Sequence, residues 1–225
     1  MSFKFVSTVP LLAAALVAAE TDAAKRLDAA ADAFREVMDV AERAIPQRLL
    51  DKSECVVVVP GLKKGAFIIG AKYGRGFASC RKKGAGWGAP GGVRVEGGSF
   101  GFQIGGSETD VIMLIMNERG AKRLLTSKFT VGGDASAAAG PVGRTATAET
   151  DAMMTAEILT WSRARGLFAG VSLQGATLRS DQDSNKELYG QRLLNKDIVL
   201  TDRAAPAPAK SLLELLNKFS SRRSN

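Results

Sequence analysis

The side chains best placed to do chemistry in this sequence are seven basic residues between Glu54 and Lys83, a segment with only one acid. This segment accounts for +6 of the chain's formal net charge of +8. A concentrated positive field attracts phosphate-bearing or otherwise anionic ligands. The candidate headgroup-binding residues are therefore Lys63, Lys64, Lys72, Arg75, Arg81, Lys82 and Lys83.

Glycines surround these basic residues, because residues 61–106 hold 15 of the chain's 24 glycines. Because glycine has no side chain, its backbone N–H group can approach and bind a phosphate. The other interpretation is a solvated surface, which is what a run of charges usually forms. The sequence leaves both interpretations open.

Several motifs that could indicate catalysis fail on inspection. The chain has no histidine, which excludes a Ser-His-Asp triad, a Cys-His pair and His-ligated metals. Residues 97–101 match G-x-S-x-G without its helix or histidine, so we interpret them as a bend between strands. Residues 84–89 match a loose dinucleotide fingerprint but are expected to form a loop. We therefore expect no enzyme activity, no catalytic residue and no cofactor.

The segment that starts at Asp181 begins like a calcium loop, but Lys186 and Arg192 stand where glycine and glutamate are required. We expect its side chains to cap or turn the backbone instead, and we expect no metal site.

The two cysteines, Cys55 and Cys80, flank a predicted strand. They would be buried thiols in a reducing compartment and are expected to form a disulfide in an exported protein.

The helices and strands that the sequence predicts around these residues indicate an α+β fold. An apolar stripe containing Leu27, Phe34 and Met38 predicts a helix over residues 21–45. Its polar face mixes acids and bases, so packing on a sheet is favoured over lying on a membrane. Apolar runs at 55–59 and 111–116 predict buried strands. Further strands are predicted at 67–71, 76–81, 100–105, 157–162 and 167–178.

The glycine-rich strands predict strong curvature. We therefore expect an N-terminal helix packed on a strongly curved, mostly antiparallel β-sheet or barrel, with a short C-terminal helix. Asn117 is a predicted helix N-cap. Ser211 is expected to open the C-terminal helix through a capping box with Glu214, and the tail from Ser220 is expected to lack fixed structure.

The ends of the chain divide it into three predicted parts. Residues 1–19 resemble a signal peptide, with Lys4, a short apolar core and the small-x-small pattern at 17–19. The alternative is the frayed start of the first helix. Residues 20–203 are the predicted domain, and residues 204–225 a Pro/Ala linker, short helix and tail. We expect a periplasmic or secreted protein that associates peripherally with a membrane.

An ordered set of motifs resembles the SYLF lipid-binding domain family. It runs from Pro60-Gly-Leu-Lys-Lys-Gly through Trp87-Gly-x-Pro90 and Gly101-Phe-Gln-Ile-Gly105 to Asp183-x-Asn185-x-x-x-Tyr189-Gly190. Family members bind phosphoinositides, some fungal ones bind actin, and similar bacterial proteins are often exported. The resemblance therefore implies lipid binding.

Together, these observations predict non-enzymatic binding of anionic phospholipids at a membrane of the cell envelope. Two alternatives stay open. One is a protein-interaction or structural module of the envelope, actin-binding-like in related eukaryotic members, whose basic face docks an envelope protein partner. The other is a carrier that holds an acyl chain in its apolar interior. No nucleic acid partner is expected.

Overall fold

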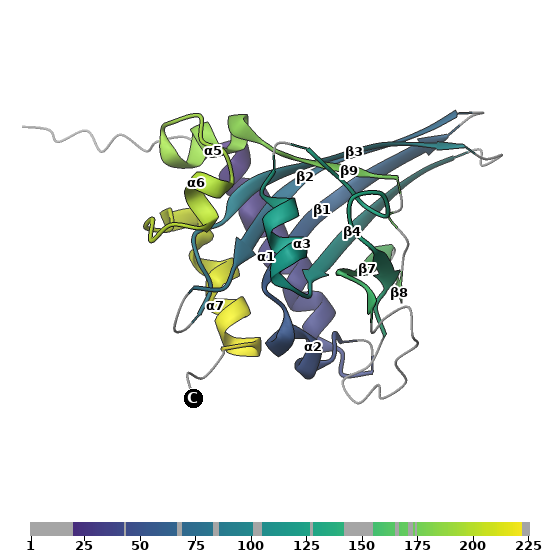
Figure 1. Cartoon of the computed structure of the whole chain (residues 1–225), viewed down its shortest axis with the longest axis horizontal. Coiled ribbons are helices and arrows are strands. Elements are labelled where there is room, and N and C mark those ends of the chain that lie inside the picture. The colour runs from purple at the N-terminus through teal and green to yellow at the C-terminus, as the bar shows by residue number, and fades with distance from the viewer. Residues whose placement is uncertain are drawn as a thin grey trace, which may run out of the picture.

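The computed structural model of this chain describes residues 20–42, 44–66, 69–82, 86–100, 105–126, 128–141, 155–164, 167–170, 173 and 175–221. The predicted signal peptide at residues 1–19 and the candidate site residue Lys83 lie outside these ranges. The fold is α+β, as predicted: helices cover a strongly curled, mostly antiparallel sheet (Figure 1).

The sheet is one curled layer whose strands follow the order β5-β9-β3-β2-β1-β4-β7-β6, with β8 paired to β7. All described strand pairs are antiparallel except β6 with β7. The strands are β1 (Cys55–Ala66), β2 (Ile69–Cys80), β3 (Gly91–Phe100), β4 (Gly105–Ile115), β5 (Phe129–Thr130), β6 (Ala137–Ala139), β7 (Ile158–Ala164), β8 (Leu167–Gly170) and β9 (Thr177–Ser180).

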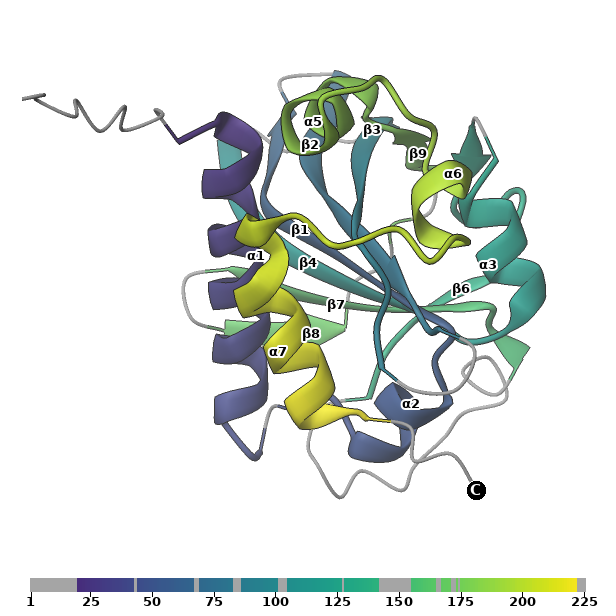
Figure 2. The same ribbon diagram turned by 90° about the vertical axis from the view of Figure 1, so that its left-hand side faces the viewer.

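The helices occupy both faces and one end of this sheet. They are α1 (Asp22–Asp39), α2 (Gln47–Lys52), α3 (Glu118–Leu124), α5 (Gln182–Tyr189), α6 (Lys196–Val199) and α7 (Lys210–Phe219), with a 3-10 turn, η1 (Ala207–Ala209). In Figure 2, α1 and α7 lie side by side in front of the sheet. The predicted stripe of α1 is buried, so this helix packs as expected.

Alternation along β1 divides the apolar core between the two faces of the sheet. Val56 and Val58 pack with α1, α2 and α7, and we call this side the α1 face. Val57, Val59 and Leu62 pack with α3, β5 and α6, and we call this side the α3 face. Because the side chains on both faces are buried, this part of the strand is apolar and does not alternate between apolar and polar residues.

Three strand predictions were wrong in their boundaries. The strands predicted at 67–71 and 76–81 are parts of one strand, β2. The strand predicted at 100–105 lies mostly outside the described residues, with Phe100 at the end of β3 and Gly105 at the start of β4. The predicted strand at 167–178 is interrupted, since Gly175 has a φ of 77° and β9 begins only at Thr177.

The bend predicted at 97–101 from its glycines was also wrong, because residues 97–100 continue β3 in register with β2. The first helix ends at Asp39 rather than Ile45, and Ile45 reaches the same core from outside the helix. The capping box at Ser211 does not form, because α7 already begins at Lys210. Ser220 is 2% exposed, so the ordered chain extends further than predicted.

Two polar capping predictions are confirmed. Asn117 is the N-cap of α3 and its side chain accepts a hydrogen bond from the N–H of Gly120. Asp181 is the N-cap of α5 and accepts from the N–H of Ser184.

Candidate functional site

The lysines of the candidate site lie where β1 and β2 approach their connection. Lys63 is opposite Tyr73, and Lys64 is directly opposite Lys72. Like charges directly opposite each other on a sheet destabilise it. Partial burial, followed by the charge of Lys72, lowers the pKa of Lys64. Within the described residues, Lys63, Lys64 and Lys72 form no salt bridge with a carboxylate.

A bulge in β1 decides which lysines share a face. The pairing of β1 with β4 shifts between Val59 and Leu62, and Gly61 adopts a φ of 58° while its N–H donates to Asp110. An extra residue moves all later side chains to the other face. Leu62 therefore points to the α3 face like Val59, and Lys64 follows it two residues later.

The neighbours of Lys64 and Lys72 are small and uncharged. Across the sheet, Lys72 is opposite Gly97 of β3 and Lys64 is opposite Ser107 of β4. Figure 1 shows the paired ends of β1–β4 extending past the helices. We call Lys63, Lys64 and Lys72 the lysine platform. It combines like charges, partial burial and approachable backbone, an arrangement that can receive an anion.

Arg75 of β2 has a different role. Its guanidinium forms a two-pronged pair with Asp181, at 2.5 Å from Nε to Oδ2 and 2.7 Å from Nη2 to Oδ1. The hydrogen bond to Asp181 raises the pKa of Arg75. Burial alone would raise the pKa of Asp181, but the bonds from Arg75 and Ser184 hold it below its ordinary value. Arg75 therefore joins β2 to the start of α5.

Arg81 closes the opposite end of the hairpin. Its guanidinium donates to the carbonyl oxygens of Ser220 (2.6 Å), Leu50 (2.9 Å) and Ser53 (3.3 Å), and also to the hydroxyl of Ser220. It lies 4.0 Å from the ring centroid of Trp87. These carbonyls belong to the C-terminal ends of α2 and α7, where backbone acceptors lack helical donors. Arg81 therefore caps both helices.

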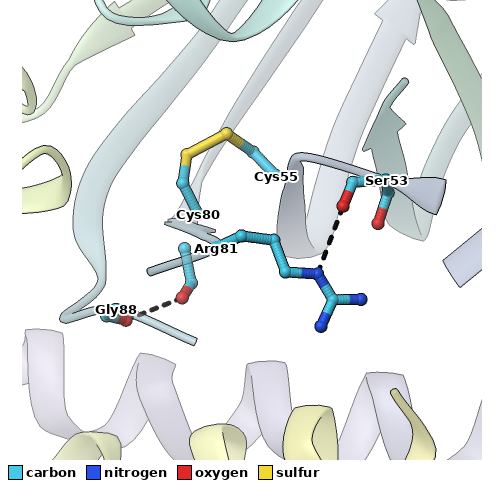
Figure 3. The surroundings of a disulfide bond; sticks show 6 residues. Ser53, Cys55, Cys80, Arg81 and Gly88 are labelled. Carbon is cyan, nitrogen blue, oxygen red and sulfur yellow. Dashed lines mark hydrogen bonds between the residues drawn. A yellow bond between two sulfur atoms is a disulfide. The ribbon is translucent and has the colours of Figure 1, made fainter. Parts of the chain in front are cut away.

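The predicted cysteine pair lies beside Arg81. Cys55 and Cys80 are in register on β1 and β2 and are joined by a disulfide (Figure 3). Figure 3 also shows Arg81 reaching Ser53 next to this bond. Both cysteines are buried. Lys82 follows Arg81 and is exposed.

The six candidate residues that the structure describes do not form one patch. Lys72 lies about 26 Å from Cys80 along β2, at about 3.3 Å per residue. The lysine platform is therefore at one end of the hairpin, and Arg81 and Lys82 are at the other. Arg75 lies between the two ends. Its side chain is on the α1 face, and its charge is paired with that of Asp181.

Two arginines were missed because the charge argument stopped at residue 83. Arg94 of β3 is directly opposite Arg75, and Arg179 of β9 is directly opposite Arg94. Their flanking residues Val93, Val95 and Leu178 face α3, so the arginines face the other way. The alternation Val-Arg-Val could have indicated an outward arginine, but not the long-range pairing with β9.

A polar cleft of about 680 Å³ lies beside the start of α3. Buried Glu157 in its wall is 2.9 Å from Nη1 of Arg123 and 4.0 Å from Nε of Arg119. This carboxylate is committed to ion pairs. In the described part of the chain, no three metal-ligating side chains gather, and no helix has the length and hydropathy needed to cross a membrane.

Comparison with known proteins gives consistent matches. The family model described as "Ysc84: Las17-binding protein actin regulator" matches residues 96–219. The human "SH3 domain-containing YSC84-like protein 1" is 30% identical over 202 residues, which cover 87% of this chain and 59% of that protein. An SH3 domain-containing protein of Schizosaccharomyces pombe is 35% identical over 181 residues, covering 79% and 42%.

A third similar protein is "Protein YSC84" of Saccharomyces cerevisiae, with 30% identity over 181 residues that cover 78% of this chain and 38% of that protein. The chain spans less than two thirds of the length of each of these relatives. The family description names a binding and regulatory role rather than a reaction.

Proposed function

Since this chain belongs to the Ysc84 (SYLF) family, we propose that it is a non-enzymatic binding module that docks on anionic phospholipid surfaces through its lysine platform. The observation that carries the proposal is the direct opposition of Lys64 and Lys72 without a carboxylate partner among the described residues. An anionic headgroup would relieve their repulsion. Lys63, from the other face of the same strand, is directly opposite Glu108 of β4 without forming a salt bridge among the described residues, and it adds a third positive charge at this end.

The expected strength follows from the number of charges. Each lysine close to an anionic bilayer contributes about 1 kcal/mol, so three contribute about 3 kcal/mol, or roughly a hundredfold in affinity. The attraction fades within a Debye length and therefore weakens as salt rises. Arg75 and Arg81 add little to this interaction, because their guanidinium groups are engaged within the fold.

An envelope location is part of the proposal. The Cys55–Cys80 disulfide supports it, since such bonds persist in oxidising compartments. The signal-like pattern of residues 1–19 supports it as well.

A protein partner is the second candidate function, and the family description favours it because it names a Las17-binding actin regulator. The same three lysines would then dock an acidic protein surface. This alternative predicts weak binding to vesicles and strong binding to one protein. A carrier would instead retain acyl chains through purification, which mass spectrometry of the extracted protein would detect.

Vesicle sedimentation tests the proposal. The variant Lys63→Gln/Lys64→Gln/Lys72→Gln should bind vesicles rich in phosphatidylglycerol about a hundredfold more weakly than the wild type. The matched control Lys122→Gln/Lys186→Gln/Lys210→Gln removes three exposed helical lysines and should bind like the wild type. Equal loss in both triple variants would reject the platform as the site. Absence of wild-type binding at low salt would reject lipid docking altogether.

A further inference from the structure

A row of three arginines crosses the α1 face of the sheet. Arg75, Arg94 and Arg179 are consecutive cross-strand partners on β2, β3 and β9. We propose that Arg94 and Arg179 form a binding site for the phosphate group of a ligand, separate from the lysine platform, with Arg75 as a positioning residue.

The charges in this row are not balanced. Asp181 is occupied by Arg75, which leaves Glu96, among the residues that the structure describes, as the only carboxylate in ion pairs with both Arg94 and Arg179. Its oxygens lie 2.6 Å from Nε of Arg94 and 3.7 Å from Nε of Arg179. Two guanidinium groups thus share one carboxylate, so the pair of arginines keeps a net positive charge.

One hydrogen-bond donor on each of the two arginines also lacks an acceptor. The Nε atoms of Arg94 and Arg179 are shielded from solvent and have no hydrogen-bond partner among the described residues. Glu96 lies two residues from Arg94 on the same strand and approaches from the side, so the close ion pair forms without a hydrogen bond. A buried donor without an acceptor costs stability, and an entering oxyanion would supply the acceptor.

The geometry suits a tetrahedral anion. Directly opposed residues on a sheet have Cβ atoms about 5 Å apart, so both guanidinium groups can reach one ligand. The planar arginine fork matches two oxygens of a phosphate. A phosphate has enough oxygens for two forks, whereas one fork satisfies a carboxylate. The side chains remain approachable, with 33% of Arg94 and 42% of Arg179 exposed.

Arg75 positions this site without touching the ligand. Its partner Asp181 follows β9 directly, and the N–H of Asp181 donates to the carbonyl of Gly92 on β3. The Arg75–Asp181 pair therefore fixes the end of β9 against β3, and with it the spacing of Arg179 and Arg94.

Calorimetric titration without membranes tests the site, with inorganic phosphate and pyrophosphate as probes and acetate as the comparison anion. We expect saturable binding of the two phosphates and none of acetate. Arg94→Gln and Arg179→Gln should each weaken binding by about tenfold or more, and the double variant should abolish it. Arg119→Gln/Arg192→Gln, which removes two exposed arginines elsewhere, should bind like the wild type.

A membrane arm separates the two sources of phosphate, and it uses protein with Lys63→Gln/Lys64→Gln/Lys72→Gln as the background, so that the lysine platform does not contribute to the readout. Phosphatidylcholine vesicles that contain phosphatidic acid present the same phosphate on a lipid. Loss of this binding in the Arg94/Arg179 double variant, without binding of free phosphate, would assign the site to a lipid headgroup. If a folded double variant matches the wild type with every probe, or the wild type binds no probe, the site is rejected. If the lysine variants bind anionic vesicles like the wild type, the lysine platform is rejected, but the test of the arginine site is unaffected.

Discussion

The two ends of the β1–β2 hairpin carry similar basic residues in opposite circumstances. At one end, Lys64 and Lys72 face each other without a carboxylate partner in the described residues. At the other, Arg81 donates to three carbonyls and stacks on Trp87 beside a disulfide. A basic residue whose donors are satisfied within the fold contributes stability, whereas an unsatisfied one is available to a ligand. Net charge in the sequence does not separate the two.

Removal of the disulfide should have the largest effect on stability. Closure of the loop between Cys55 and Cys80, which are 25 residues apart, stabilises the fold by roughly 3–4 kcal/mol. Urea unfolding of the oxidised and reduced wild type should differ by this amount. Vesicle binding by the reduced but folded protein should not change, because the lysine platform is at the other end. Equal stability of both forms would contradict this assignment.

Replacement of Arg81 by glutamine should cost about 2–3 kcal/mol, because three carbonyls at the ends of α2 and α7 each lose a hydrogen bond from its charged guanidinium. Urea unfolding measures the loss. Lys82→Gln is the control, since an exposed neighbour should change stability by less than about 0.5 kcal/mol. Similar effects of the two substitutions would mean that Arg81 is a surface charge after all.

The Arg75–Asp181 pair should appear as an acid-dependent contribution to stability. The pKa of Asp181 is lower in the folded state, so the pair stabilises the fold above the ordinary aspartate pKa of about 3.9. This contribution is lost as the pH falls toward the folded-state pKa. Asp181→Asn should be less stable than the wild type at neutral pH, and the difference should shrink in acid. A difference that stays constant with pH would argue against the ion pair.

The lysine platform should contribute least to stability. Lys64→Gln/Lys72→Gln removes a repulsion and no salt bridge from the described residues. We therefore expect a change within about 0.5 kcal/mol, if anything toward greater stability. A large destabilisation would show that these lysines hold the fold together, as Arg81 does.

The sequence predicted the elements whose signals are local. The apolar run at 55–59 indicated a buried strand, the stripe of α1 indicated packing, and Asn117 and Asp181 indicated caps. The glycine-rich strands were harder, because glycine is common in turns and also in bulged or closely approached strands. The glycine pattern therefore predicts two separate strands where the structure has β2, and a bend where the structure has the end of β3.

The candidate site depended on contacts that no local signal contains. Arg81 meets Ser220, which is 139 residues away in the chain. The bulge at Gly61 moves Lys64 to the face of Lys72, and Arg94 meets Arg179 only through the pairing of β3 with β9. Charge composition found a basic segment correctly, but only register and packing divide it into structural and available residues.

Site-specific labelling tests most directly which end of the hairpin meets the membrane. A fluorophore on Ser107→Cys would lie beside Lys64, and one on Lys82→Cys would mark the Arg81 end; both positions are exposed. With anionic vesicles that carry a lipid-linked quencher, we predict strong quenching at position 107 and little at position 82. Stronger quenching at position 82, or equal quenching at both, would contradict the assignment of the lysine platform as the membrane-facing end.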